Sequence, residues 1–286
     1  MEITSEIKKT REIIKQAKAA GKTIGLVPTM GALHEGHLSL IRICRQKCDF
    51  VIVSIFVNPT QFGPAEDLAK YPRPFEWDCR LCRDNGVDLV FAPAAEEMYP
   101  QKQIIWVDVE TLGDHLCGAS RPGHFRGVCT VVAKLFNIIT PDIACFGQKD
   151  AQQLAIIRQM VRGLNMNLEI CPCPTVREPD GLALSSRNQY LDSQQRQQAL
   201  CLLQALRRAG EMVAAGQSDT QAIIAAMKEI IERQPQTRID YISIVDNDLL
   251  QPISRLDRPA LIALAVYLGP TRLIDNIIVD PANKSL

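Results

Sequence analysis

Two histidines three positions apart stand in the stretch of the sequence that is best suited to chemistry. His34 and His37 lie in a glycine-bearing segment that follows a short apolar run, residues 23–27, and precedes an apolar pattern with helical spacing. A strand, a turn and a helix start form a common phosphate site, because the first N–H groups of a helix lack internal partners. Histidine can donate to phosphate oxygens and stabilise the charge that builds during attack on phosphorus. The segment therefore predicts chemistry on a nucleotide phosphate.

Two other interpretations of these histidines are a zinc site and an ordinary polar turn. His34-Glu-Gly-His37 resembles a zinc-protease motif, but that motif needs its histidines four positions apart on one helix face. The chain has four histidines in all. Two of them in one glycine-flanked turn argue against an ordinary surface turn.

Two further polar stretches could bind phosphate. In Gly147-Gln-Lys149-Asp150, the lysine offers a point charge and the aspartate can accept from a ribose hydroxyl or cap a helix. In Leu184-Ser-Ser-Arg187, two hydroxyls and a guanidinium suit polyphosphate oxygens. Taken alone, the first stretch is more typical of a solvated helix cap than of a phosphate site. The alternative for the second stretch is a capped turn.

Apolar runs alternate with helical patterns over the first part of the chain. We expect helices near residues 7–17, 128–139 and 154–161, and strands at residues 23–27, 50–57, 87–92, 104–109 (an edge strand), 142–146 and 168–171. This alternation predicts an α/β fold with a Rossmann-like parallel sheet and helices on both faces. Ligands of such sheets bind beyond the carboxyl ends of the strands, which is where the polar stretches lie.

The pattern changes near residue 177. Two helices are expected at residues 193–215 and 219–234, followed by strand-like runs at residues 238–245, 261–268 and 273–279. We therefore expect two domains: residues 1–176 as the Rossmann-like domain and residues 177–286 as a smaller α+β lid domain, with a hinge near Pro179.

Composition limits the partners and the compartment. Lys+Arg and Asp+Glu are both 32, so the chain lacks the basic excess of a nucleic-acid-binding protein. Residues 1–10 carry charges and no apolar core, and no run of 18 apolar residues occurs, so we expect neither a signal peptide nor a membrane span. Ten cysteines in such a chain predict reduced thiols in the cytoplasm, packed as small apolar side chains.

His34-Glu-Gly-His37 resembles the His-x-Gly-His signature of the nucleotidyltransferase superfamily, which is similar in fold to class I aminoacyl-tRNA synthetases. The longer run from Pro28 to His37 resembles one family in particular, the pantoate–β-alanine ligases (pantothenate synthetases). Motifs similar to that family's recur in order. They include Ser185-Ser-Arg-Asn188, where the superfamily usually has a lysine-containing loop. The others lie at residues 58–63, 67–73, 121–132, 177–184 and 272–276. The resemblance covers residues 24–276.

This resemblance implies a two-step ligation. ATP and pantoate would first give pantoyl adenylate and pyrophosphate, with Mg²⁺ on the phosphates. The amine of β-alanine would then attack the acyl carbon and release AMP. The implied partners are small molecules and a second copy of the chain in a homodimer, with no nucleic acid and no membrane.

The resemblance also implies roles for individual residues. His34, His37, Lys149 and Arg187 would be catalytic. Pantoate would be held by Asn58, Gln61 and Gln153, whose amides can donate and accept. The metal ligands stay unassigned, with Asp78 considered for that role. The expected ATP-binding residues are Met30, Gly31, Ala32, Leu33, His34, Glu35, Gly36, His37, Gly147, Gln148, Lys149, Asp150, Val176, Leu184, Ser185, Ser186 and Arg187.

Two alternatives remain open from the sequence. A different adenylyltransferase of the same superfamily would need basic residues near Gln61 and Gln153, where amides stand. A non-catalytic ATP-binding module would be expected to have lost a charged site residue, and all are present.

Overall fold

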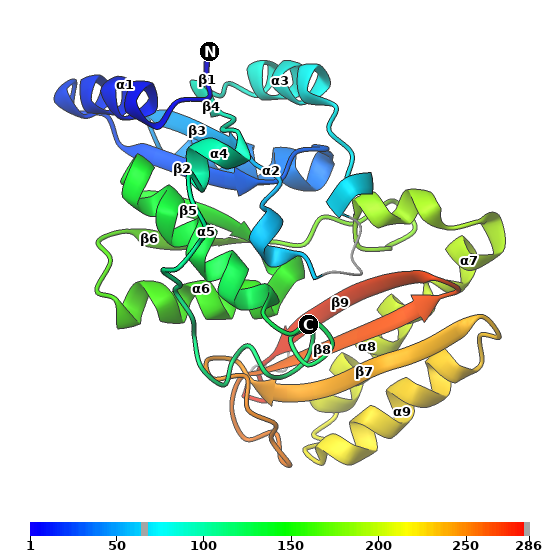
Figure 1. The fold of residues 1–286 in the computed structure, drawn as a ribbon. Helices are drawn as coiled ribbons and strands as arrows, with labels where there is room; N and C mark the ends of the chain where they lie inside the picture. Colours follow the sequence, from blue (N-terminus) through cyan, green and yellow to red (C-terminus); the bar gives the residue numbers. More distant parts are fainter. Residues whose placement is uncertain (64–67, 283–286) are drawn as a thin grey trace. The chain divides into compact units, whose positions relative to one another are not determined.

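The computed structural model describes residues 1–63 and 68–282 and divides into two compact units (Figure 1). Unit 1 comprises Met1–Asp114, Gly118–Gln148 and Ile156–Pro174. Unit 2 comprises His115–Cys117, Lys149–Ala155 and Thr175–Leu286. Two short segments of the earlier chain are therefore grouped with the C-terminal part.

Unit 1 contains a six-stranded parallel sheet in the order β1-β4-β3-β2-β5-β6. Its central strands are continuous apolar runs because both faces of the sheet are covered. The fold class expected from the sequence is confirmed. The strands are β1 (Glu2–Thr4), β2 (Ile24–Thr29), β3 (Phe50–Ile55), β4 (Leu89–Phe91), β5 (Ile143–Gly147) and β6 (Glu169–Cys173).

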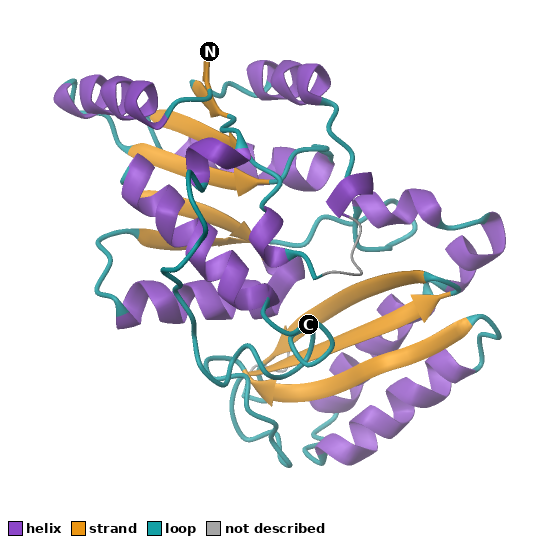
Figure 2. Cartoon of the chain, viewed as in Figure 1, coloured by secondary structure: helices purple, strands orange, loops and turns teal. Residues whose placement is uncertain are grey.

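Helices cover both faces of this sheet (Figure 2). Helix α2 (Glu35–Lys47) contacts α3 (Phe75–Asp84), and their buried residues share one core cluster with one face of the sheet. Helix α1 (Ile7–Ala19) contacts α5 (His124–Ile139), and both contact β2. The short α4 (Ala95–Met98) follows β4, and α6 (Ala151–Gly163) follows β5.

Unit 2 is built on a three-stranded antiparallel sheet in the order β7-β8-β9. Its strands are β7 (Thr237–Asp246), β8 (Ala260–Leu268) and β9 (Thr271–Val279). Helices α8 (Cys201–Ala214) and α9 (Thr220–Glu232) pack against each other and against the sheet, as Figure 2 shows. Together they enclose a separate apolar core, as expected for a small α+β unit.

Two expected elements were wrong. Residues 104–109 form no strand: Ile104 and Ile105 are 75% exposed, and the N–H of Val107 donates to Thr130 Oγ1 on α5 at 3.1 Å. Their β propensity is not expressed because no neighbouring strand pairs with them. The sequence predicted one helix at residues 193–215, but the structure has two consecutive helices, α7 (Ser193–Gln198) and α8. Their apolar residues keep the spacing of a single helix, so the pattern does not reveal the break.

Candidate functional site

The signature turn leaves β2 through a left-handed backbone. Thr29 Oγ1 donates to the carbonyl of Ser54 on β3 at 2.8 Å and accepts from the N–H of Gly31 at 3.2 Å. Gly31 (φ 85°) and Ala32 (φ 51°) both lie in the left-handed region. A Cβ at Gly31 would stand 2.9 Å from Asp78 Oδ2 and 3.1 Å from Ile55 Cγ2, so both φ and space require glycine there.

Asp78 on α3 fixes this turn. Its two carboxylate oxygens accept the N–H groups of Ala32 and Leu33, each at 2.8 Å, and the residue is 1% exposed. Burial raises the pKa of the carboxyl, while the two backbone donors oppose that rise. Because N–H donors occupy both oxygens, Asp78 holds the turn and is a poor metal ligand. The signal that could have found it is an acid on the buried, cysteine-bearing face of a helix.

The two histidines form a reciprocal cap at the start of α2. His34 Nδ1 accepts the N–H of Gly36 at 3.1 Å, and His37 Nδ1 accepts the N–H of His34 at 3.3 Å. Since each Nδ1 is an acceptor, each neutral ring carries its proton on Nε2. The ring centroids are 4.2 Å apart. The turn thus orients two Nε2–H donors at a helix N-terminus, as an anion site requires.

Two predicted residues next to the histidines differ in their surroundings. Glu35 is exposed and pairs with Arg42 on the same helix. Met30 lies at the other end of the turn, and its Sδ accepts from Gln61 Nε2 at 3.1 Å. Unit 1 therefore brings Gln61, predicted to bind substrate, into contact with the signature stretch.

Asn58 acts within the protein, where the sequence predicted substrate binding. It is 1% exposed, and its Nδ2 donates to Gln61 Oε1 at 3.1 Å and to the carbonyl of Gly127 at 3.2 Å. Its Oδ1 accepts from the hydroxyls of Tyr99 at 2.8 Å and Thr60 at 3.0 Å. This network sets the position of the Gln61 amide.

The 3₁₀ turn η1 (Pro59–Gln61) is anchored on the first turn of α5. A Cβ at Gly127 would stand 2.3 Å from the carbonyl oxygen of Thr60, so glycine lets η1 rest on the helix. His124 Nδ1 donates to the carbonyl of Gln61 at 2.8 Å, which leaves Nε2 to accept from Arg121 Nη1 at 3.1 Å. The sequence predicted no role for His124 and Arg121, although both lie in the motif at residues 121–132.

In unit 2, Lys149 follows the end of β5. Its Nζ lies 4.0 Å from Asp150 Oδ2, and its carbonyl accepts from Asn276 Nδ2 on β9 at 2.9 Å. The neighbouring Gln152 is buried, and its amide holds the backbone of Cys117 and His115 at 2.9 and 2.7 Å. Gln153, the residue predicted to bind pantoate, is the partly exposed one of the pair.

The Ser185–Arg187 stretch is held by a polar network. Ser185 Oγ accepts the N–H of Arg187 at 3.2 Å, and Arg187 itself is exposed. Asn188 Nδ2 donates to Glu178 Oε1 at 2.6 Å, and Arg196 donates to Glu178 at 2.7 Å. Leu184 and Val176, both predicted to bind ATP, are joined by an N–H···O bond of 2.9 Å.

An ion pair between the partly buried Arg177 and the buried Asp275 connects two motifs to which the sequence assigned no roles. Arg177 donates to both oxygens of Asp275 at 2.7 and 3.0 Å, and Asp275 is 2% exposed. The same arginine donates to the carbonyl of Gly181 at 3.2 Å. Bidentate pairing fixes the hairpin before Ser185 to β9.

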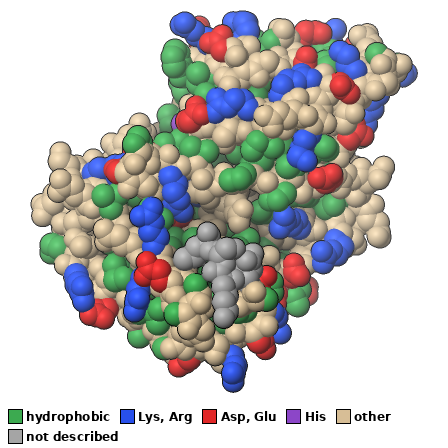
Figure 3. Space-filling view, turned by 180° about the vertical axis from the view of Figure 1, so that it is seen from behind, with side chains coloured by type: hydrophobic (Ala, Val, Ile, Leu, Met, Phe, Trp, Pro, Cys, Tyr) green, Lys and Arg blue, Asp and Glu red, His purple; other side chains and the backbone are tan. Residues whose placement is uncertain are grey.

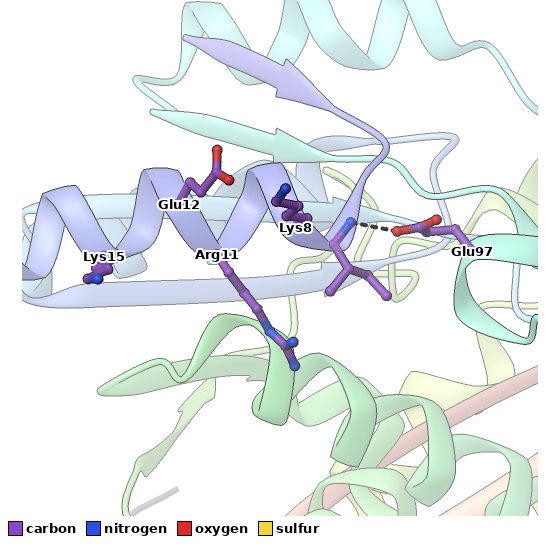
Figure 4. A pocket seen from close by; sticks show the side chains of 6 residues that line it. Lys8, Arg11, Glu12, Lys15 and Glu97 are labelled. Atoms are coloured by element: carbon purple, nitrogen blue, oxygen red, sulfur yellow. Dashed lines mark hydrogen bonds between the residues drawn. The ribbon is translucent and has the colours of Figure 1, made fainter.

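The pocket drawn in Figure 4 lies elsewhere, on α1. It is an open surface pocket of about 440 Å³ lined by residues that include Lys8, Arg11, Lys15 and Glu97, and Glu97 Oε1 accepts the N–H of Ile7 at 2.7 Å. None of its lining residues belongs to the predicted site. On the face shown in Figure 3, basic and acidic side chains are interspersed.

Among the described helices, none combines the length and apolar character needed to cross a membrane.

Comparisons with known proteins place this geometry in context. The family model for pantoate-beta-alanine ligase matches residues 2–278. The pantothenate synthetases of Caldicellulosiruptor bescii and Moorella thermoacetica are each 55% identical over 280 residues, covering 98% of this chain and 99% of theirs.

Solved structures give the same family. A pantothenate synthetase from Thermus thermophilus matches with a TM-score of 0.91 at 44% identity, covering 97% of this chain and 99% of that one. A pantoate-beta-alanine ligase from Francisella tularensis, complexed with beta-gamma ATP and beta-alanine, matches with a TM-score of 0.80 at 36% identity, covering 98% and 99%.

Proposed function

The chain belongs to the pantoate–β-alanine ligase family and is an enzyme that joins pantoate to β-alanine, and we propose that it does so through pantoyl adenylate with the residues described above. ATP is the activating substrate, as the ligand of the Francisella tularensis relative suggests. The observation that carries the proposal is the reciprocal cap, in which the Nδ1 atoms of His34 and His37 hold both imidazole rings at the start of α2.

In the first step, a carboxylate oxygen of pantoate attacks the α-phosphorus of ATP. The bond from that phosphorus to the bridging oxygen breaks, and pyrophosphate leaves. Two anions must meet, so donors have to stabilise the charge that develops. His34 and His37 supply Nε2–H donors, and the N-terminus of α2 supplies backbone N–H groups.

Other predicted residues act on the remaining parts of ATP. Lys149 neutralises phosphate oxygens, and Ser185, Ser186 and Arg187 hold the departing pyrophosphate. Gly147, Val176 and Leu184 line the adenine or ribose. The exposure of Arg187 supports this role, because a guanidinium that reaches solvent can also reach a ligand.

Pantoate is held by the amides of Gln61 and Gln153, which can bind both its hydroxyls and its carboxylate. Asn58 orients Gln61 and does not contact substrate, because its side chain is already bonded within the protein. In the second step the neutral amine of β-alanine attacks the acyl carbon, AMP leaves, and the nitrogen releases a proton.

The phosphates of ATP would be bound together with Mg²⁺. Magnesium keeps several waters and uses one or two carboxylates together with phosphate oxygens. Asp150, half exposed beside Lys149, fits that need, whereas the oxygens of Asp78 are committed to the signature turn. The ion supplies charge neutralisation on the phosphates.

We also propose an oligomeric state and a cellular compartment. The chain acts as a homodimer in the cytoplasm on small molecules, with residues 1–176 binding nucleotide and pantoate and residues 177–286 acting as a lid. Ten free thiols are consistent with a reducing compartment. The exposed Ile104 and Ile105 are apolar side chains available to a second copy.

An isotope-exchange experiment tests the adenylate intermediate. Labelled pyrophosphate should enter ATP when enzyme, Mg²⁺ and pantoate are present and β-alanine is absent, because the first step is reversible. Exchange that requires β-alanine, or that proceeds without pantoate, would contradict an acyl-adenylate route.

A further inference from the structure

Three buried thiols gather on one face of the unit 1 sheet. Cys145 on β5 is the register partner of Cys171 on β6, and Cys173 stands two residues further along the same strand. Side chains two apart on a strand point to the same face, as do directly paired residues of neighbouring strands. The three Sγ atoms all lie within 4.8 Å of one another, the one such group of metal-ligating atoms among the described residues.

Helix α2 brings two more thiols over this face. Cys44 and Cys48 are one turn apart, and the Cys44 thiol interacts with those of both Cys48 and Cys145. A Cβ at Gly25 of β2 would stand 2.3 Å from Cys44 Sγ and 2.8 Å from Cys48 Sγ. Glycine on the central strand therefore makes room for sulfur.

The three thiols are buried, and one positively charged side chain lies near them. Cys145 and Cys173 are 0% exposed and Cys171 is 5% exposed. The Lys47 ammonium at the end of α2 lies close enough to Cys171 and Cys173 to favour their thiolates. Contacts with neighbouring thiols together with burial raise the pKa of Cys145 and Cys173, and burial raises the pKa of Cys171, so without a ligand all three thiols are protonated near neutral pH.

We propose that Cys145, Cys171 and Cys173 form a binding site for one soft divalent metal ion of the Zn²⁺ or Cd²⁺ type. Sulfur ligands select such ions, and metal–sulfur bonds of about 2.3 Å place sulfurs about 4 Å apart. The three Sγ atoms, all within 4.8 Å of one another, are therefore close enough to bind one ion together.

The charges of the proposed site nearly balance. On binding, three S–H bonds break, three metal–sulfur bonds form, and three protons leave to solvent. Three thiolates and one divalent ion carry a net charge of −1, which the Lys47 ammonium offsets. A hard ion such as Mg²⁺ is excluded by the ligand type.

Cadmium titration of the metal-free, reduced protein tests the site. We expect thiolate-to-cadmium charge-transfer absorption that saturates at one ion per chain, with three protons released per ion, displaceable by Zn²⁺ and unaffected by Mg²⁺. Cys145→Ala and Cys173→Ala should each abolish the tight phase. Cys129→Ala removes an equally buried thiol of α5 and should leave it intact.

Two results would overturn the proposal: no saturable absorption in the folded wild-type protein, or an identical titration in Cys145→Ala. Lys47 gives a test that does not depend on a core substitution, because its side chain is exposed. Lys47→Met should weaken Cd²⁺ binding by up to about fivefold, with recovery in Lys47→Arg. Equal affinity for Cd²⁺ in wild type, Lys47→Met and Lys47→Arg would show that the Lys47 ammonium does not offset the charge of the site. These readouts are independent of ligase activity.

Discussion

Asp78 supports the signature turn through hydrogen bonds from the backbone N–H groups of Ala32 and Leu33, and it belongs to a different element from the residues that it orients. Ala32 has a positive φ without being glycine, which costs free energy that surrounding contacts must offset. The buried carboxylate supplies two such contacts. The direction of both histidine rings follows from this turn.

Removing that carboxylate should cost stability and ATP affinity together. Asp78→Ala leaves two N–H groups buried without acceptors, a loss on the order of 2–5 kcal/mol in the free energy of unfolding. Urea unfolding and ATP titration measure the two effects. Asp84→Ala, on an exposed carboxylate of the same helix, is the control and should change stability by less than about 0.5 kcal/mol. Equal effects of the two substitutions would contradict the role of Asp78.

The same residue should make stability depend on pH in a defined direction. Burial raises the pKa of Asp78 above its ordinary value, so the folded protein binds this proton more tightly than the unfolded chain does. That stabilising contribution is complete below the ordinary pKa and is lost as the pH rises through the raised value. The stability gap between wild type and Asp78→Ala should therefore narrow as the pH rises from the ordinary pKa of an aspartate, about 4, through the raised pKa of Asp78. A gap that widens with pH would contradict this sign.

The two nitrogens of His37 should be separable by substitution. Nδ1 caps α2 and Nε2 is assigned to the α-phosphate. Asparagine reproduces an acceptor near Nδ1, whereas glutamine reaches the position of Nε2 with an N–H donor. Single-turnover formation of the adenylate should fall by about 10²-fold or more in His37→Ala and His37→Asn, and by less in His37→Gln. The opposite order would assign His37 to the cap alone.

At the scale of elements, the contact between α5 and η1 positions the substrate amide. Gly127→Ala would drive a Cβ into the carbonyl of Thr60, so η1 must shift and carry Gln61 with it. We expect a loss of about 1–3 kcal/mol in stability and a KM for pantoate raised about tenfold or more. Steady-state kinetics with varied pantoate give the second quantity.

Gly163→Ala provides the matched control for that substitution. Gly163 ends α6, and a Cβ there meets nothing within 4 Å. It should leave KM unchanged and stability equal or slightly raised, by up to about 1 kcal/mol. A KM for pantoate that stays at the wild-type value in Gly127→Ala would show that η1 does not position the substrate.

The sequence was informative about elements whose pattern is local. Residues 50–55 and 261–268 are apolar almost throughout and are strands, and the signature turn was recognisable from its glycines and histidines. Contacts between distant segments were not accessible. No local pattern shows that Asp78 accepts a hydrogen bond from Ala32 or that Asn58 accepts one from Tyr99. The pairing of Arg177 with Asp275 is equally invisible in the local sequence. These depend on which elements become neighbours, and that is decided by the whole core.

At the scale of the whole molecule, ATP should change the hydrogen exchange of the Ser185 stretch. The backbone there is held by a few side-chain bonds near solvent, which favours local opening. A non-hydrolysable ATP analogue with Mg²⁺ should slow amide exchange across Leu184–Asn188, measured by mass spectrometry. Residues 220–232 of α9 serve as the internal reference. Unchanged exchange at Leu184–Asn188 under saturating analogue would argue against the proposed lid.

Release of pyrophosphate and AMP from ATP tests which reaction the enzyme catalyses. With Mg²⁺ and wild-type enzyme, we predict steady release of both products in equal amounts only when pantoate and β-alanine are both present. With pantoate alone, release of pyrophosphate should stop after about one equivalent per active site, because the adenylate stays bound. Sustained turnover with another acid or a phosphate ester, and none with pantoate, would contradict the ligase function and assign the same fold to a different adenylyltransferase.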